Sequence, residues 1–547
     1  MIMVKKAEII MLIFALLISV ILHFPLVPHE MGWDSFYIHR AADSIIYYHQ
    51  IKWLVNPLSF VGYYPYSYPS GVITLLAELS SLAGIDMEHT ILLFTFLEGI
   101  LAVLYSFYLG KKLFPIGNGK WIFVFLSALS PGLLYFTLWT VSTRGFISIL
   151  FVLLIYLILE TKGFFHSTKS KKFALLTLIF LFISPTIHRL WIFIIPFIVI
   201  FLIVRVIITK WNIHKNLKYS IILVLAFVLV ISVFLLLSFF YSKTFNYFVH
   251  YNIYEPYTYY LMGLHYGRLN GPLIFILPLG LFYAIKEKRE NIFYILLFAI
   301  MLLPLYYISS YTAVISYVVF PIFISYGILK LSLFLKEKRK HGNNYGKKVS
   351  TLAVISLITI NIIFAGIVQY YHPNITGRER YGETYMEEGT YNAGIWLKHS
   401  YHPERRDTII VNYNPERFVS ISQDQSISDR DVFELINNFT TMKDGDIIIN
   451  KKLWTWPDIG PFVLKHPYVT AYSYWYPLVY HSPSDKFSKN VQVKFNVSIV
   501  AEDIDVAGYQ QWAPSFGIPI KKSIFYQKIG YVSYKIFEND KFRIYYW

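Results

Sequence analysis

Long apolar runs separated by short polar connections fill the first two thirds of the chain. About eleven of them are predicted to cross a bilayer, near residues 7–25, 88–110, 121–138, 145–160, 173–187, 190–209, 219–240, 272–285, 291–309, 312–335 and 349–370. A helix of about 20 residues spans the apolar core and satisfies its own backbone hydrogen bonds there. The pattern therefore predicts a polytopic α-helical membrane domain over residues 1–370.

From residue 371 to 547 the apolar runs shorten and polar residues mix in. The spacing predicts helices at 390–400 and 429–439 and strands at 407–413 and 444–452. Further strands are expected at 469–480, 491–500, 528–537 and 541–547, the last two joined by a turn at Glu538, Asn539 and Asp540. This is the pattern of a separate α/β domain with a β-rich end.

Composition and charge agree with a membrane protein. The 547 residues are 56% hydrophobic and only 15% charged, with mean hydropathy +0.48, whereas soluble domains are about 25% charged. The net charge of +16 lies mostly in alternate connections, so it indicates topology and not a nucleic-acid surface. These basic connections are Lys5–Lys6, Lys111–Lys120, Lys162–Lys172, Lys210–Lys218, Lys286–Arg289 and Lys336–Lys348. They are predicted to be cytoplasmic, with the N-terminus inside and residues 371–547 outside the cell membrane.

The chain contains no cysteine, so thiol chemistry and disulfides are excluded. Its first exterior connection, residues 28–86, is long, and such loops are often functional. Ionisable residues cluster at the start of this loop, just outside the membrane, where they are costly unless charge is handled there. They are Asp34, His39, Arg40 and Asp43. The second half of the loop becomes amphipathic and is expected to form an interfacial or re-entrant helix.

The motif His29-Glu30, then Asp34 and Arg40-Ala41, then Tyr68-Pro69 resembles the first exterior loop of the oligosaccharyltransferase catalytic subunit. That family belongs to the GT-C superfamily, the membrane glycosyltransferases that use polyprenyl-phosphate sugars. The segment around Glu255 and the ending KIFENDKFRIYYW also resemble parts of the family. The resemblance implies a lipid-linked sugar donor, an acceptor outside the cytoplasm and a divalent metal.

Two departures from the family pattern bear on chemistry. The family binds its metal with the first-loop Asp and an acidic motif in the second exterior loop, but that stretch here, TLWTVSTRGF, offers Arg144 and no carboxylate. The family's Trp-Trp-Asp acceptor signature is matched only by LWTWPDIG, residues 453–460. In addition, Ser35 stands where the family has Pro. Metal dependence and transfer to asparagine are therefore both open.

Asp34 is the predicted catalytic residue. It could act as a general base toward an acceptor hydroxyl, hold a metal ion, or pair with Arg40 or His39. Arg40, His188, Arg189 and Arg268 are candidates to bind the donor phosphate, because a guanidinium stays charged and donates two parallel bonds. Snorkelling at the interface is the alternative for such residues.

Further candidates are Glu255, His265 and Arg144 for substrate binding, with Glu255 and Asp43 also possible metal ligands beside Asp34. Glu98 falls inside a span, where a carboxylate is costly, and a structural role is favoured. No nucleotide-, zinc- or calcium-binding motif occurs in the sequence.

The sequence thus favours a membrane glycosyltransferase that moves a sugar or oligosaccharide from a polyprenyl phosphate or pyrophosphate to a protein, lipid or glycan acceptor. The required cofactor is either none or a divalent ion such as Mg²⁺ or Mn²⁺. The alternative is a noncatalytic multi-pass protein, a transporter or a receptor-like scaffold with an exterior sensor domain. A transporter would usually show internal repeats, and none is evident.

Overall fold

The computed structural model describes a large part of the chain. The described residues are 6–25, 27–48, 70–115, 117–161, 168–210, 217, 219–226, 228, 263, 266–303, 310–337, 345–378, 386–400, 408–411, 482–494, 497–504, 509–510, 521–522 and 524–547. They fall into two compact units. The membrane unit comprises 1–24, 94–138 and 142–371, and the loop unit comprises 25–93, 139–141 and 372–547.

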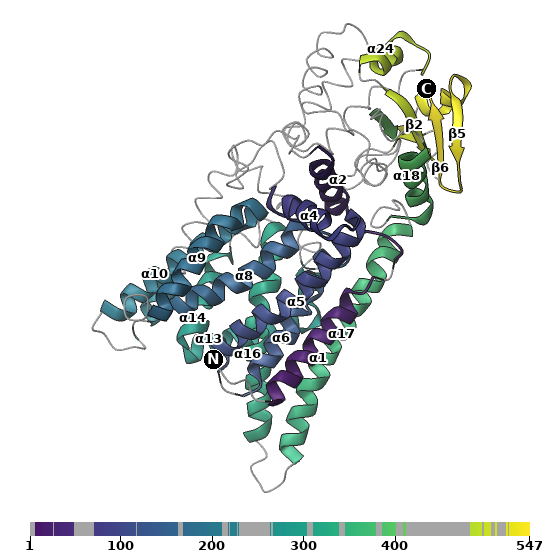
Figure 1. The fold of residues 1–547 in the computed structure, drawn as a ribbon. Helices are drawn as coiled ribbons and strands as arrows, with labels where there is room; N and C mark the ends of the chain where they lie inside the picture. Colours follow the sequence, from purple (N-terminus) through teal and green to yellow (C-terminus); the bar gives the residue numbers. More distant parts are fainter. Residues whose placement is uncertain are drawn as a thin grey trace. The chain divides into compact units, whose positions relative to one another are not determined.

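The membrane unit is built of helices, several of them long and apolar (Figure 1). Its helices are α1 (Lys6–His23), α5 (Met87–Leu113), α6 (Gly119–Ala128), α7 (Pro131–Thr137), α8 (Thr143–Glu160), α9 (Thr168–Ile187), η2 (Arg189–Phe193), α10 (Ile194–Lys210), η3 (Pro272–Ile276), α13 (Leu277–Glu287), α14 (Glu290–Met301), α16 (Ser310–Glu337) and α17 (Tyr345–Arg378).

Eight stretches in the described part are long and apolar enough to cross a membrane, and they coincide with eight of the predicted spans. They are Lys6–His23, Met87–Leu113, Gly119–Thr137, Thr143–Glu160, Ser170–Ile187, Leu190–Ile207, Thr312–Lys336 and Lys348–Ile367. The predicted spans 272–285 and 291–309 overlap with the shorter helices η3, α13 and α14, and spans 219–240 and 291–309 lie partly outside the described residues. The polytopic helical fold is confirmed, and the total of eleven spans stays a prediction.

Ion pairs join helix ends that the charge pattern assigns to one side. Glu8 of α1 pairs with Lys120 of α6, and Lys112 Nζ of α5 lies 2.8 Å from Glu160 Oε1 of α8. The side-chain amide of Asn291, at the start of α14, donates to the backbone oxygen of Lys112 at 3.1 Å. Chain direction thus alternates between α1, α5, α6 and α8 as the topology requires.

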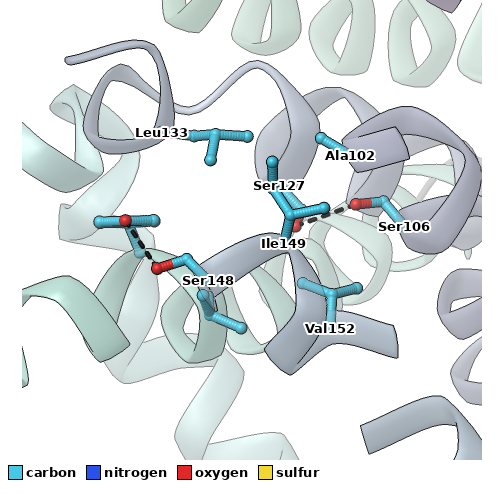
Figure 2. Close-up of a pocket in the computed structure, with 9 residues that line it drawn as sticks. Ala102, Ser106, Ser127, Leu133, Ser148, Ile149 and Val152 are labelled. Atoms are coloured by element: carbon cyan, nitrogen blue, oxygen red, sulfur yellow. Dashed lines mark hydrogen bonds between the residues drawn. The ribbon is translucent and has the colours of Figure 1, made fainter. Parts of the chain in front are cut away.

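A small cavity lies between helices of the membrane unit (Figure 2). Its wall includes two hydroxyl pairs, Ser106 with Ser127 at 3.2 Å and Ser148 with Tyr317 at 2.8 Å. The helices supplying these residues are α5, α6, α8 and α16. Each buried hydroxyl therefore has a partner, which a polar group inside an apolar bundle requires.

The loop unit contains the predicted first exterior loop, residues 28–86, and the C-terminal domain. Its helices are α2 (Trp33–Tyr48), α4 (Ser70–Ala83), α18 (Glu388–Ser400), α24 (Lys486–Lys494), α25 (Ile524–Lys528) and η7 (Ile529–Tyr531). Its main sheet has the order β1 (Thr408–Val411), β2 (Val497–Asp503), β6 (Phe542–Tyr546) and β5 (Tyr534–Glu538), with β1 and β2 parallel and the other pairs antiparallel. A separate pair joins β3 (Tyr509–Gln510) to β4 (Lys521–Lys522).

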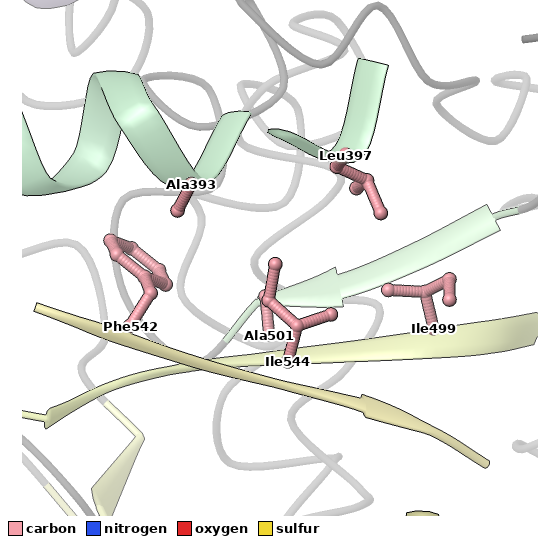
Figure 3. Close-up of a cluster of buried hydrophobic side chains, with 6 residues drawn as sticks. All are labelled: Ala393, Leu397, Ile499, Ala501, Phe542 and Ile544. Atoms are coloured by element: carbon pink, nitrogen blue, oxygen red, sulfur yellow. The ribbon is translucent and has the colours of Figure 1, made fainter. Parts of the chain in front are cut away.

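Helix α18 covers one face of the sheet (Figure 3). Ala393 and Leu397, four residues apart on the helix, pack against alternate residues of the strands: Ile499 and Ala501 of β2 and Phe542 and Ile544 of β6. Apolar residues four positions apart on the helix and two positions apart on the strands thus face one another and form one apolar layer. This is the predicted α/β layer.

Several local predictions in the loop unit are confirmed. The helix at 390–400 corresponds to α18, the strand at 407–413 contains β1, and the final hairpin is formed by β5 and β6. The amphipathic half of the first loop forms α4, which packs against α2. Predictions at 429–439, 444–452 and 469–480 lie outside the described residues.

Two strand predictions are wrong in part. Residues 491–494 belong to α24, and strand β2 begins at Val497. Residues 528–531 are helical and precede β5. Both stretches have alternating apolar residues, but short alternation also fits one or two helical turns, and neighbouring packing decides between them.

The topology predicted from the basic connections places two exposed positions on opposite sides of the membrane. Lys171, at the start of α9, is expected in the cytoplasm, and Ser484, in the turn before α24, is expected outside. In this cysteine-free protein, Lys171→Cys and Ser484→Cys should therefore react with a membrane-impermeant thiol reagent from opposite faces of sealed vesicles. Labelling of both from one face would contradict the predicted topology.

Candidate active site

Helix α2 places the predicted catalytic residue. Asp34 lies in its first turn, partly buried, where the helix dipole favours a negative charge. The preceding Gly32 has φ +89, and a Cβ there would lie 2.4 Å from Thr140 Oγ1. Glycine is thus required both by the left-handed backbone and by the close approach of residues 139–141.

The short segment 139–141 is held against the start of α2 by two backbone donors. The N–H of Met31 donates to the Trp139 oxygen at 2.9 Å, and the N–H of Val141 donates to Ser35 Oγ at 2.9 Å. Trp139 itself has φ +39, unusual for a bulky residue, and such strain often marks a functional site. A proline at position 35, as in the family pattern, would offer no side-chain acceptor for the Val141 N–H.

His39 and Asp43 of α2 form a buried ionic group with Glu30, which precedes the helix. His39 Nδ1 lies 2.5 Å from Glu30 Oε2, and its Nε2 lies 3.5 Å from Asp43 Oδ2. Burial disfavours a charged imidazole, but attraction by Glu30 and hydrogen bonds to Asp43 and Glu30 outweigh it and raise the pKa of His39 to about 10. Burial also raises the pKa of Glu30, against the opposing pull of His39. His39 therefore carries its proton at neutral pH, and Asp43 is a second carboxylate partner of its imidazole.

A second group links His29 to two helices. Its Nδ1 lies 3.0 Å from Glu88 Oε1 in α5, and its Nε2 lies 3.0 Å from Glu388 Oε2 in α18. The His29 ring stacks on Tyr391 of α18 at 3.9 Å. Burial alone would lower the pKa of His29, yet the two carboxylates raise it. The Glu30 N–H donates to Glu88 Oε1 at 3.1 Å, which joins the two groups.

These contacts fix α2 within the loop unit. The Glu30 oxygen also accepts from the N–H of Met386 at 2.9 Å, and Phe36 of α2 packs against Met386 beside Tyr391 and Ile395. The motif His29-Glu30 therefore connects the first exterior loop to α18, and it does not itself present a reactive group. Glu88, Glu388 and Tyr391 were not identified from the sequence, since they lie far from the motif along the chain.

Most of the remaining candidates belong to the membrane unit. Arg144 begins α8, Arg268 lies in the helical residues 266–270, and His188 is buried, with Nδ1 accepting from the N–H of Leu190 at 3.0 Å. That bond caps η2, so His188 has a structural task. Arg189 belongs to η2 and Arg40 to α2, but their side chains lie outside the described residues, as do Glu255 and His265 entirely.

Glu98 of α5 is fully buried, and neither carboxylate oxygen has a hydrogen-bond partner among the described residues. Nearby, a Cβ on Gly99 would lie 2.7 Å from the His23 ring, so α1 and α5 pack closely at this level. A buried carboxylate without a partner is costly, and its location inside a span agrees with the expectation from the sequence.

The described side chains that could act as metal ligands do not by themselves form a site for the divalent ion that the resemblance implies. No three His, Asp or Glu side chains come together in an arrangement that could hold a metal among the described residues. Within the loop unit, Glu30, Glu88 and Glu388 are directed at histidines. A hard divalent ion needs several oxygen ligands around it.

Comparison with known proteins places the fold. No family model and no curated protein matches the chain. Among solved structures, the apo oligosaccharyltransferase of Archaeoglobus fulgidus aligns with TM-score 0.61 and 12% identity, over 92% of this chain and 70% of that one. ArnT from Cupriavidus metallidurans bound to undecaprenyl phosphate aligns with TM-score 0.52 and 10% identity, over 99% and 98%. The chain therefore shares the fold of these two proteins. The resemblance seen in the first exterior loop is thus confirmed for the fold.

Proposed function

We propose that this protein is a membrane glycosyltransferase that moves a sugar or oligosaccharide from a polyprenyl phosphate or pyrophosphate to an acceptor outside the cytoplasm. The supporting observation is the position of Asp34 in the first turn of α2, a helix held by a buried ionic network, in a chain that shares its fold with an oligosaccharyltransferase. A catalytic side chain keeps its productive geometry when surrounding residues fix the helix that carries it through packing and hydrogen bonds. Acceptor and donor sugar are left open.

Asp34 is the proposed general base. An acceptor hydroxyl attacks the anomeric carbon of the lipid-linked sugar, its proton passes to the Asp34 carboxylate, and the new glycosidic bond forms. The bond from the anomeric carbon to the phosphate oxygen breaks, and the phosphate leaves with that electron pair on the polyprenyl lipid. The leaving phosphate supplies the driving force, so the transfer as written consumes no redox or nucleotide cofactor.

Two branches of this function have separate support. The first exterior loop resembles that of oligosaccharyltransferases, and an A. fulgidus oligosaccharyltransferase is known in complex with an inhibitory peptide and a dolichol-phosphate. ArnT, in contrast, matches this chain over nearly the full length of both. A transfer assay with purified protein in liposomes, offering polyprenyl-linked single sugars and oligosaccharides in parallel, separates the branches. If no protein-dependent transfer occurs with any donor, the noncatalytic scaffold is favoured.

Metal removal gives an independent prediction. Because Glu30, Glu88 and Glu388 are directed at histidines and TLWTVSTRGF contains no carboxylate, we expect EDTA to leave most transfer activity intact. The measurement is the initial rate of sugar transfer before and after chelation, with and without added Mg²⁺ or Mn²⁺. Complete loss that either ion restores would contradict the expectation and assign ligands to Asp34, Asp43 or Glu255.

A further inference from the structure

The N-terminal turn of α18 is connected to the segment that precedes α2. The Glu30 oxygen accepts from the Met386 N–H at 2.9 Å, and the His29 ring stacks on Tyr391. Helix α2 begins directly after this segment. A shift of the α18 turn therefore displaces the backbone that carries Asp34 at the start of α2.

The same turn of α18 is contacted by the tip of the C-terminal hairpin, residues 539–541, which joins β5 to β6. The side-chain amide of Asn539 donates to the Gly389 oxygen at 2.8 Å, and Lys541 Nζ lies 2.7 Å from Glu387 Oε2. A Cβ on Gly389 would lie 2.6 Å from the Cβ of Lys541, so the absence of a side chain permits this close approach. The hairpin tip thus lies directly on the backbone of the helix.

Hydrogen bonds within the hairpin tip fix its conformation. Asn539 Oδ1 accepts from the N–H groups of Lys541 at 2.9 Å and of Phe542 at 2.6 Å. The backbone N–H of Asn539 donates to the Phe542 oxygen at 3.0 Å. Phe542 continues the contact with α18, because it packs in the same apolar layer as Ala393 (Figure 3). Asn539 therefore closes the turn through its side-chain oxygen and attaches it to α18 through its side-chain nitrogen.

Lys541 brings a buried charge to this contact. The residue is only 9% exposed, and its ammonium group also lies 3.7 Å from Oδ2 of the fully buried Asp503, at the end of β2. A buried charge is tolerated when opposite charges and hydrogen bonds compensate it. Separation of the tip from α18 would take this cation away from Glu387, so the position of the tip is strongly defined.

We propose that Asn539 and Lys541 are positioning residues for Asp34, acting through the N-terminal turn of α18. The inference rests on the proposed function, in which Asp34 is the general base, and it gives the C-terminal hairpin a part in the reaction. The hairpin tip holds the turn of α18, the turn holds the Glu30 backbone, and that backbone determines where α2 begins. A displacement of about 1 Å at a catalytic group can lower the rate by about 100-fold.

Two substitutions displace the hairpin tip in different ways. Asn539→Asp keeps the oxygen that closes the turn, but it replaces the amide donor beside the Gly389 oxygen with a second acceptor, which the carbonyl repels. Gly389→Ala places a methyl group against Lys541. Because alanine is a better helix former than glycine, any loss in this variant does not come from a weakened α18.

The experiment measures sugar transfer and amide hydrogen exchange in the purified full-length protein. We expect Asn539→Asp and Gly389→Ala to lower kcat by about tenfold or more at a nearly unchanged KM for the lipid-linked donor. Both should also reduce the exchange protection of the α2 amides while the protection of β2 and β6 persists. A role in folding alone would reduce the amount of folded protein and leave kcat per folded molecule unchanged.

Glu538→Gln is the matched control on the same hairpin, because Glu538 pairs with the exposed Lys535 at the other side of the turn. It should match the wild type in both measurements. An equal fall of kcat in this control would overturn the positioning role of the hairpin tip.

The two measurements separate this inference from the proposed function. Wild-type kcat, or unchanged protection of α2, in both Asn539→Asp and Gly389→Ala would overturn the positioning role even in a protein that transfers sugar. Loss of α2 protection in both variants of a protein that transfers no sugar from any donor would refute the proposed function and leave the coupling between the hairpin and α2 in place.

Discussion

Replacement of Asp34 by asparagine is expected to lower sugar transfer by about 100- to 10,000-fold, the usual contribution of a general base. The amide keeps the shape of the side chain but cannot accept the acceptor's proton. The contacts of Gly32, Ser35 and Glu30 that position the start of α2 do not depend on the Asp34 charge. The variant should therefore insert and fold. The measurement is transfer from a polyprenyl-linked donor in membranes, normalised to protein level.

Asp86→Asn provides the matched control. Asp86 is an exposed carboxylate before α5 that accepts from the N–H of His89 at 3.0 Å, and asparagine caps a helix equally well. It should transfer at close to the wild-type rate. A wild-type transfer rate in Asp34→Asn would contradict the assignment of the active site to the first loop. Equal losses of transfer in Asp34→Asn and Asp86→Asn would indicate a nonspecific effect of removing a negative charge.

The membrane helices were predictable because their physical rule is local. A long apolar run must become a helix in a bilayer, and the basic ends determine the side on which each connection lies. The ion pairs Glu8–Lys120 and Lys112–Glu160 follow from that topology. The sequence did not predict α7 and α13 as separate helices within the spans 121–138 and 272–285. Their ends depend on prolines and on neighbouring helices rather than on hydropathy.

The candidate site was predictable only in part. Asp34, His39 and Asp43 attract attention because charge beside a membrane is expensive, and the structure places all three on α2. The partners of His29 could not be foreseen, since Glu88 and Glu388 come from α5 and α18 and only folding brings them together.

Replacement of Glu30 by glutamine is expected to destabilise the loop unit by about 3 kcal/mol or more. Glu30 and His39 are both almost fully buried, at 0% and 3% exposure, so the variant leaves the imidazolium with the more distant Asp43 as its counter-charge. The cost should appear as lost hydrogen-exchange protection of the amides of α2 (Trp33–Tyr48), which Glu30 and His39 hold in place.

Glu388→Gln is the matched control, because the Glu388 side chain is 64% exposed although it also pairs with a histidine. Exposed pairs contribute under about 1 kcal/mol, so this variant should keep nearly the protection of the wild type. Equal effects of the two substitutions would show that burial does not decide the strength of these pairs.

The pH dependence of the Glu30 variant has a defined sign. The pKa of His39 in the folded protein is about 10, above the ordinary value of 6.5, so the stability that its proton contributes is complete below about 6.5 and is lost as pH rises through about 10. The difference in stability between wild type and Glu30→Gln should therefore be large near pH 7 and shrink above pH 10, where His39 is neutral in both. Tryptophan fluorescence during urea unfolding at each pH gives this difference. A gap that persists unchanged above pH 10 would mean that Glu30 acts through packing and not through the charge of His39.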